Sequence, residues 1–145
     1  MEARGNVRVR RGRRSDLARV RTLLPAIDGT SRERFDRRTL ASLAGDVYVA
    51  EDAAGDIVGI VSVAYLRSIA EGRFAAVLDT ARVAADSPPL LDRLIAFAEA
   101  RARRRGCRRL AAMLGPGDAA LRAALQSRGY GTGDVLVAEL GSEGR

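Results

Sequence analysis

The residues with the greatest potential for chemistry lie between Ala81 and Arg93, where a strand-like pattern gives way to a helix-like one. Residue periodicity predicts a strand from Phe74 to Val83, a helix from Leu90 to Arg105 and a second strand from Arg108 to Leu114. Two strands joined by one helix lie parallel, because an antiparallel pair needs only a tight turn. Such units bind small ligands at the carboxyl ends of their strands, where the helix N-terminus receives an anion. We therefore expect any site to include Ala81 to Arg93.

The composition removes several kinds of chemistry from consideration. The chain contains no histidine, which excludes serine-histidine triads and zinc hydrolysis at histidine-ligated sites. Its single cysteine, Cys107, excludes an internal disulfide framework and a cysteine metal cluster. With no histidine to activate it, Cys107 is interpreted as a small packing residue rather than a nucleophile.

The positive charge of the chain comes entirely from arginine. The net charge is +7, and all 25 basic residues are arginines. The arginines from Arg8 to Arg14 and from Arg101 to Arg109 are able to hold phosphates or RNA, and such a chain binds polyanions nonspecifically at low salt. Aromatic residues for base stacking make up only 4% of the chain, so we expect no specific nucleic-acid partner.

Length and hydropathy predict one domain covering residues 1–145. A chain of 145 residues, 47% of them apolar, is long enough to bury a core. The basic N-terminus, Met1 to Arg14, is followed by no apolar signal-peptide region, and no apolar run has the length of a membrane span. We expect a soluble, cytoplasmic protein with no membrane partner.

The first half of the chain predicts a strand, two helices and a hairpin. Alternation of Val7 and Val9 with arginines predicts a short strand, and Ser15 is a candidate cap for a helix that stops before Pro25. Ser31 is the corresponding candidate for a second helix, which ends before Gly45. Branched residues then predict a hairpin of two strands, Val47 to Glu51 and Ile57 to Leu66.

The last third of the chain predicts a helix and a closing strand. Residues 115–118 turn the chain into a helix that ends at Arg128, with Asp118 as its cap and Gly129 as its C-terminal stop. Tyr130 to Leu140 are predicted to close the sheet as a final strand, although Gly131 and Gly133 weaken its start.

The order β-α-α-β-β-β-α-β-α-β resembles the GCN5-related N-acetyltransferase (GNAT) superfamily over nearly the whole chain. The likeness is carried by Val7 to Leu17, Val47 to Glu51 with Ile57 to Gly59, Ala102 to Cys107, and Ala119 to Tyr130. The resemblance implies an α/β domain (a mixed α+β arrangement) with a central, splayed mixed sheet. It also implies that acyl-CoA lies between the strands that end near Val83 and Leu114.

The same resemblance implies transfer of an acetyl group from acetyl-CoA to an amine of a small molecule or peptide. It places on the fourth strand an acidic residue, Asp79, that helps deprotonate the amine, and burial would raise its pKa toward that task. The alternative is a strand carboxylate paired with an arginine. The implied cofactor-binding residues are Ala81, Arg82, Val83, Ser87, Leu90, Leu91, Arg93 and Asp118, the last at a position where many members have Asn.

Two departures from the family pattern favour a protein without this activity. The family's arginine- and glycine-rich diphosphate loop is replaced by residues 84–90, in which Pro88 and Pro89 lack N–H donors. Asp86 and Asp92 add negative charge there, and a capping Ser87 would occupy another amide. Leu125 stands where the family often has the tyrosine that protonates the leaving thiolate.

Two hypotheses follow. In the first, the chain is an N-acyltransferase that binds acetyl-CoA weakly, with substrate loops at Asp28 to Arg32 and Leu66 to Arg73. In the second, it is a catalytically inactive GNAT-fold module that acts as a binding or regulatory partner through its own homodimer. The fold favours the first, and the two missing motif elements favour the second.

Overall fold

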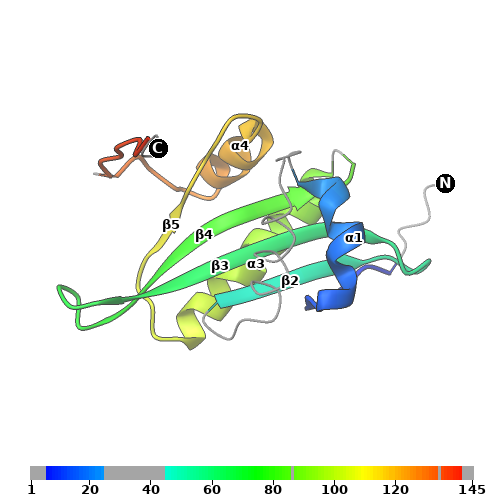
Figure 1. The fold of residues 1–145 in the computed structure, drawn as a ribbon, viewed down its shortest axis with the longest axis horizontal. Coiled ribbons are helices and arrows are strands. Elements are labelled where there is room, and N and C mark those ends of the chain that lie inside the picture. The colour runs from blue at the N-terminus through cyan, green and yellow to red at the C-terminus, as the bar shows by residue number, and fades with distance from the viewer. Residues whose placement is uncertain (1–5, 25–44, 86, 134, 142–145) are drawn as a thin grey trace.

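The computed structural model describes residues 6–24, 45–85, 87–133 and 135–141 of the chain (Figure 1). Its strands are β1 (Arg8–Arg11), β2 (Gly45–Glu51), β3 (Ile57–Ser68), β4 (Arg73–Val83) and β5 (Leu110–Ala112). Its helices are α1 (Leu17–Val20), α3 (Pro88–Arg104) and α4 (Ala119–Ser127), and α1 lies between two 3₁₀ turns, Arg14–Asp16 and Arg21–Leu23. None of the helices in these ranges is long and apolar enough to cross a membrane.

The strands form one mixed sheet in the order β1-β2-β3-β4-β5. The first four strands pair antiparallel, and β5 pairs parallel to β4, as the single helix between them requires. This confirms the predicted βαβ unit and the predicted mixed α/β arrangement.

Helices cover both faces of the sheet, and each covered face is a separate part of the core (Figure 1). On one face, α1 packs Leu17 and Val20 against Val47 and Val49 of β2. On the other face, the long helix α3 packs an apolar stripe on β3 and β4 and carries α4 beside it. Successive side chains of a strand point to opposite faces, so Val49 of β2 belongs to the first part of the core and its neighbour Ala50 to the second.

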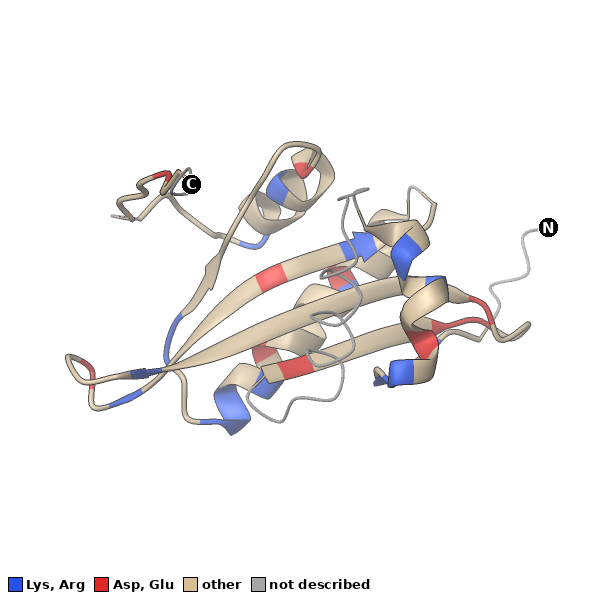
Figure 2. Ribbon diagram, viewed as in Figure 1, with Lys and Arg blue, Asp and Glu red and all other residues tan. Residues whose placement is uncertain are grey.

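Buried carboxylates form ion pairs with several of the arginines. Asp46 is 1% exposed, and it accepts hydrogen bonds from Tyr65 Oη at 2.7 Å and Arg11 Nη2 at 2.9 Å. The guanidinium groups of Arg101 and Arg105 also lie against this carboxylate, at 3.5 and 3.3 Å. Figure 2 shows acidic and basic residues intermixed around β2 and the C-terminal end of α3. Arginines in this region therefore connect β1, β2, β3 and α3.

The pKa of Asp46 lies below its usual range. Burial acts to raise this pKa, but the hydrogen bond from Tyr65 and the charges of Arg105 and Arg101 outweigh burial. A second buried carboxylate, Asp16, also has a lowered pKa, chiefly because Arg10 donates two hydrogen bonds to it at 2.9 and 2.8 Å. Both carboxylates are ionised partners of arginine in the folded protein.

Two sequence predictions for the elements are wrong in detail. The first helical stretch is broken into an α-helical turn between two 3₁₀ turns; it begins after Arg13, and Asp16, not Ser15, supplies the side chain that bonds to this start. The Asp16 carboxylate accepts the N–H of Arg13 at 2.7 Å. The predicted second helix from Ser31 and the predicted loop Asp28 to Arg32 lie outside the described residues.

The predicted final strand, Tyr130 to Leu140, is also wrong for the described residues of that stretch. Residues 130–133 and 135–141 are irregular, and the sheet ends at β5. The β-branched pattern of Val135 and Val137 suits a strand, but β5 is only three residues long and offers a short edge for pairing. The glycines at 131 and 133 raise the entropic cost of extending the chain next to it.

Candidate functional site

Strands β4 and β5 separate immediately after a short paired stretch (Figure 1). Their pairing joins Ala76–Leu78 to Leu110–Ala112, and the last bond runs from Met113 N to Leu78 O at 3.1 Å. Beyond it β4 continues to Val83 while the other chain segment turns toward α4. We call the space between residues 79–83 of β4 and residues 113–118 the β4–β5 opening.

A bulge in β4 marks the start of this opening. Ser62 of β3 lies opposite Thr80 and Val63 lies opposite Leu78, so Asp79 has no partner residue in β3. An extra residue of this kind bends the strand and increases its twist. The bulge therefore explains why β4 leaves β5 at this point.

Beyond the bulge, backbone groups of β4 face the opening. The N–H of Ala84 donates to Val58 O of β3 at 2.8 Å, so the backbone groups of residue 84 face β3. Backbone groups of alternate residues point to opposite sides of a strand. Those of Ala81 and Val83 therefore point away from β3, into the β4–β5 opening, while the Ala81 side chain is buried in the core. The opening offers an extended ligand two donors and two acceptors.

An ion pair spans the opening. Arg82 Nη2 donates to Asp118 Oδ1 at 3.1 Å, with side chains 27% and 14% exposed. The other carboxylate oxygen of Asp118 accepts the N–H of Gly115 at 2.8 Å. Asp118 is thus at the N-terminus of α4, but its side chain holds the preceding turn instead of capping the helix as predicted. The structure brings together two predicted site residues from opposite sides of the opening.

The N-terminus of α3 is poor in donors. Ser87 is in the cap position, Pro88 and Pro89 occupy the first two helical positions, and Leu91 N donates to Ser87 O at 3.0 Å. Of the four N–H groups that a helix start normally exposes, the prolines remove two, so those of Ser87 and Leu90 remain. The Ser87 side chain makes no capping bond, which corrects the expectation that it occupies an amide. The Leu91 side chain is buried in the core.

The charges around this helix start differ from those expected. Asp92 forms an ion pair with Arg128 at 2.8 Å, so its negative charge is offset. Arg93 donates to the carbonyl of Val7 at 2.8 Å. Since Val7 precedes β1, at the opposite edge of the sheet from β5, Arg93 lies outside the β4–β5 opening. Asp86 lies outside the described residues, and Arg82 is the predicted site arginine that the structure places in the opening.

Asp79, the predicted base, is exposed, because it sits in the bulge rather than in a paired stretch of the sheet. The expected burial of this carboxylate is therefore wrong. Its carboxylate accepts a hydrogen bond from Thr80 Oγ1 at 3.2 Å, and no ion pair to it occurs within the described ranges. The alternative interpretation, a carboxylate neutralised by arginine, has no support in those ranges either. Asp79 is thus a solvated carboxylate at the entrance of the opening.

No tyrosine takes the place of the missing acid. Leu125 is 3% exposed and belongs to the core between α3 and α4. The three tyrosines of the chain lie elsewhere: Tyr48 against Phe97, Tyr65 on Asp46 and Tyr130 on Glu99. Burial, followed by the hydrogen bond to Glu99, raises the pKa of Tyr130 above its usual value.

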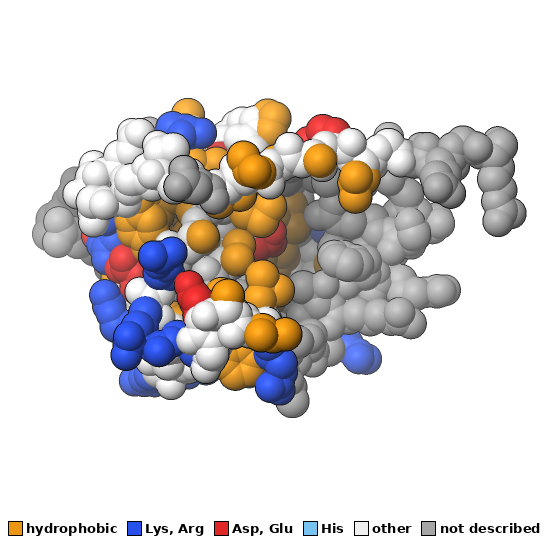
Figure 3. All heavy atoms as spheres, turned by 90° about the vertical axis from the view of Figure 1, so that its left-hand side faces the viewer, with side chains coloured by type: hydrophobic (Ala, Val, Ile, Leu, Met, Phe, Trp, Pro, Cys, Tyr) orange, Lys and Arg blue, Asp and Glu red, His pale blue; other side chains and the backbone are white. Residues whose placement is uncertain are grey.

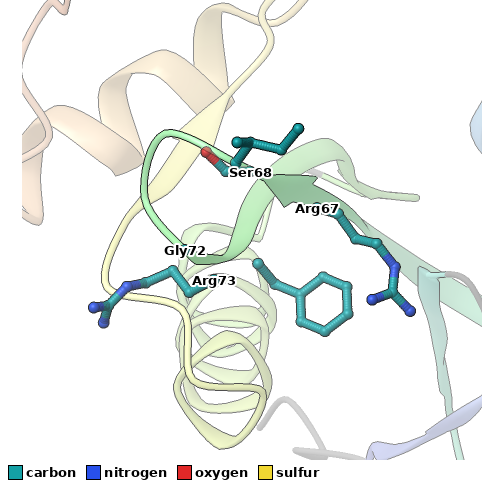
Figure 4. Close-up of a pocket in the computed structure, with 6 residues that line it drawn as sticks. Arg67, Ser68, Gly72 and Arg73 are labelled. Carbon is teal, nitrogen blue, oxygen red and sulfur yellow. The ribbon is translucent and has the colours of Figure 1, made fainter.

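A cavity of about 300 Å³ lies at the hairpin between β3 and β4 (Figure 4). Phe74 forms part of its wall, with the Arg67 guanidinium 5.2 Å from the ring centroid, while Arg73 points to the other side. The cavity coincides with the predicted substrate loop Leu66 to Arg73. Asp79 lies five positions after Phe74 along extended β4, roughly 17 Å away, so this cavity is not next to the opening. Its residues are Arg67, Ser68, Ile69, Gly72, Arg73 and Phe74.

Comparisons with known proteins support the fold. An aminoglycoside N-acetyltransferase, AAC(6')-Iy, solved in complex with CoA, superimposes with a TM-score of 0.76 at 15% identity, covering 98% of this chain and 99% of that one. Ribosomal-protein-alanine N-acetyltransferase from Brucella melitensis biovar Abortus 2308 gives a TM-score of 0.71 at 18% identity, covering 92% and 99%. A transcriptional regulator from Bacillus halodurans C-125 gives 0.73 at 22% identity, covering 93% and 100%.

Sequence comparisons add no closer relative. No protein-family model matches the sequence. No curated protein matches it significantly. The structural likeness shows that the chain has the GNAT acetyltransferase fold, which confirms the fold that the sequence resemblance implied. Since one fold carries many functions, only the residues of the β4–β5 opening indicate which activity this chain has.

Sequence reasoning missed the two features that define the opening. Arg82 and Asp118 were each candidates, but 36 residues separate them and nothing in either segment predicts their pairing. The bulge at Asp79 has no glycine to signal it, since Leu78, Asp79 and Thr80 continue the strand pattern without interruption.

Proposed function

We propose that this protein is an N-acyltransferase that takes an acetyl group from acetyl-CoA and transfers it to an amine. The observation that carries the proposal is the unpaired edge of β4 at Ala81 and Val83, facing the β4–β5 opening. The pantetheine arm of CoA contains two amides in an extended chain. It is able to pair with this edge as an added strand would, through backbone hydrogen bonds. A solved protein of the same fold is in complex with CoA, which supports CoA as the ligand.

The diphosphate of the donor would be held weakly. Arg82 supplies one guanidinium, and the N–H groups of Ser87 and Leu90 are the donors left at the start of α3. Each missing amide bond to a charged oxygen costs on the order of 1.5 to 3 kcal/mol. Two prolines therefore lower affinity by roughly a hundredfold or more relative to a helix start with its full set of donors. Arg82 offsets part of this loss when it leaves Asp118.

The chemistry needs few protein groups. The thioester of the bound donor supplies an activated acyl carbonyl to an attacking amine. Asp79, exposed at the start of the opening, would accept the amine proton directly or through water. Leu125 offers no proton to the leaving thiolate, so solvent would supply it. The acceptor we propose is a small-molecule or peptide amine, the class to which aminoglycosides, bound by a solved relative of the same fold, belong.

Calorimetric titration with acetyl-CoA tests the proposal. We expect binding by the wild type that is lost in Val83→Pro, because proline removes the N–H that faces the opening while the β3-facing bonds stay. Arg93→Ala is the control, since Arg93 contacts Val7 at the opposite edge of the sheet and its loss should leave binding unchanged. Absence of wild-type binding at millimolar acetyl-CoA would contradict the proposal.

A second candidate is a GNAT-fold module without catalysis. The paired prolines at the start of α3 and the buried Leu125 are the observations that favour it. Thiol release from acetyl-CoA separates the two candidates, measured with a panel of polyamines, aminoglycosides and peptide N-termini. Amine-dependent release that falls in Asp79→Asn supports the enzyme. Binding of acetyl-CoA without release from any amine supports the inactive module.

A further inference from the structure

Arginines from the two basic runs of the sequence meet at one buried carboxylate. Arg11 of β1 donates from Nη2 to Asp46 Oδ1 at 2.9 Å. Arg101 Nε lies 3.5 Å from Asp46 Oδ2, and Arg105 Nη2 lies 3.3 Å from Asp46 Oδ1. The fold therefore joins the start of the sheet to the C-terminal end of α3 through guanidinium groups. We call Arg11, Arg101 and Arg105 the arginine cluster.

The arginine cluster carries more positive charge than its partner balances. In the part of the chain that the structure describes, Asp46 is the only carboxylate that pairs with any of the three arginines. Three positive charges and one negative charge leave an excess of two positive charges at this place. Like charges held close together repel each other, and a bound anion relieves that repulsion.

Most N–H donors of the arginine cluster are unused. Each guanidinium group has five such donors. Among the described residues, their hydrogen bonds use one nitrogen of Arg11 and one of Arg105, both with Asp46 as the acceptor. The buried Nε of Arg101 makes no hydrogen bond to any of these residues. The cluster therefore has donors to offer to a further acceptor.

Aromatic rings hold the three guanidinium groups without using these donors. The guanidinium carbons of Arg11 and Arg101 lie 5.2 and 5.6 Å from the centroid of the Tyr48 ring. That of Arg105 lies 4.5 Å from the centroid of the Tyr65 ring. The face of a ring attracts a cation through its electrons, so the N–H groups remain available. The arginine side chains are 40%, 25% and 31% exposed, so a ligand from solvent is able to reach them.

These properties favour a phosphate group as the ligand. Planar guanidinium groups match the oxygens of phosphate and bind them in pairs. A phosphate monoester carries about −1.5 to −2 charges at pH 7, which matches the excess, whereas a carboxylate carries one. Basic side chains also gather on the end of the molecule at which the β3–β4 hairpin and the C-terminal end of α3 lie (Figure 3). Such a surface attracts anions from solution.

The arginine cluster is remote from the β4–β5 opening. Arg101 lies in the last turn of α3, whose first turn borders the opening, and a helix of 17 residues is roughly 25 Å long. Arg11 belongs to β1, which is at the opposite edge of the sheet from β5. A phosphate group bound by the cluster is therefore not the diphosphate of a donor bound in the opening.

We propose that the arginine cluster binds the phosphate group of a phosphate monoester, as a second ligand besides acyl-CoA. The phosphate oxygens accept N–H groups from Arg11, Arg101 and Arg105. Asp46 keeps its hydrogen bond from Tyr65, at 2.7 Å, and holds the three guanidinium groups close together.

Calorimetric titration of the full chain with inorganic phosphate, at constant ionic strength, tests this site. We expect saturable binding by the wild type and an affinity lower by about tenfold or more in Arg101→Gln/Arg105→Gln, because charge-assisted hydrogen bonds are lost. The matched control, Arg103→Gln/Arg104→Gln, removes the same charge from exposed positions at the same end of α3 and should bind as the wild type does. A wild type without saturable binding, or a control that weakens as much as Arg101→Gln/Arg105→Gln, would overturn the proposal.

A conservative variant keeps the test decisive if Arg101→Gln/Arg105→Gln fails to fold, which circular dichroism will show. Arg101→Lys retains the positive charge beside Asp46 but lacks the planar fork of donors. Its phosphate affinity should therefore fall severalfold while its circular dichroism spectrum stays that of the wild type. Unchanged phosphate affinity in this folded variant would contradict the proposal.

Three further probes identify the source of the phosphate group. Glucose 6-phosphate and a phosphoserine peptide carry monoesters, and a single-stranded oligonucleotide without a terminal phosphate carries only singly charged diesters. Both monoesters should bind more weakly to Arg101→Gln/Arg105→Gln than to Arg103→Gln/Arg104→Gln, and the tighter of the two identifies the source. The oligonucleotide should bind these two variants equally. If the oligonucleotide alone distinguishes them, the cluster binds nucleic acid and the proposal of a monoester site is refuted.

Discussion

The ion pair between Arg82 and Asp118 allows a sharp test of how charge is arranged around the β4–β5 opening. Arg82 Nη2 lies 3.1 Å from Asp118 Oδ1, with Arg82 27% exposed and Asp118 14% exposed. In the proposed complex Arg82 must leave Asp118 to reach a phosphate, and the carboxylate then remains beside an anion. We therefore predict that Asp118→Asn tightens acetyl-CoA binding.

The size of the gain follows from the strength of the pair. Partly exposed ion pairs contribute about 0.2 to 1 kcal/mol, so removing the competition for Arg82 lowers the Kd by about 1.4- to 5-fold. Removing the repulsion between carboxylate and phosphate acts in the same direction, and salt screens that part of the gain. Asparagine retains a side-chain oxygen for the N–H of Gly115, now bonded at 2.8 Å, so the turn before α4 is preserved.

Calorimetric titrations at low and high salt measure this change. Glu71→Gln is the matched control, because it makes the same change in net charge at the exposed β3–β4 hairpin, at the other end of β4. The gain of Asp118→Asn over Glu71→Gln should shrink as salt rises. If Asp118→Asn binds no more tightly than Glu71→Gln at low salt, the ion pair does not compete with the ligand and the reasoning fails.

Three further predictions concern the stability and reactivity of the fold. Asp46→Asn leaves Arg11, Arg101 and Arg105 without their carboxylate and should lower the free energy of unfolding, measured by urea denaturation, by about 3 kcal/mol. This is the lower end for a broken buried pair, because the arginines are partly solvated. An unchanged denaturation midpoint would contradict the role of Asp46. The pKa values of Asp16 and Asp46 are lowered by folding, so both carboxylates should stabilise the fold fully above about pH 4, the pKa in the unfolded chain. This stabilisation should be lost as the pH falls toward their pKa values in the folded protein. Urea denaturation at several pH values between 7 and 3 measures the loss. Burial raises the pKa of Cys107, so its thiol should react with a maleimide or disulfide reagent slowly in the folded protein and rapidly in urea. Fast labelling of the native protein would contradict the place of Cys107 in the core.

The parts of the fold that sequence reasoning predicted well are those with local causes. The apolar spacing of α3 and the branched residues of β3 and β4 are periodic signals, and the parallel pairing of β4 and β5 follows from the helix between them. The prediction of a final strand from Tyr130 to Leu140 had the same kind of local support. It failed because a strand also needs an edge long enough to pair with, and β5 is only three residues long.

The site was less predictable because its causes are not local. Proline in the first turn of α3 removes donors wherever the helix packs, so that consequence was visible in Pro88 and Pro89. The exposure of Asp79 depends instead on a bulge, and the neutralisation of Asp92 depends on Arg128, which is 36 residues away. Local patterns in the sequence carry no information about these partners.

The central claim is that acyl-CoA binds along the unpaired edge of β4, and amide NMR spectra of the labelled protein during titration with acetyl-CoA test it most directly. The account predicts that the N–H signals of Ala81 and Val83 shift and become protected from hydrogen exchange. The N–H of Ala84, which donates to Val58 in β3 at 2.8 Å, should change little. Saturable binding that leaves the Ala81 and Val83 signals unperturbed would place the ligand elsewhere and contradict the account.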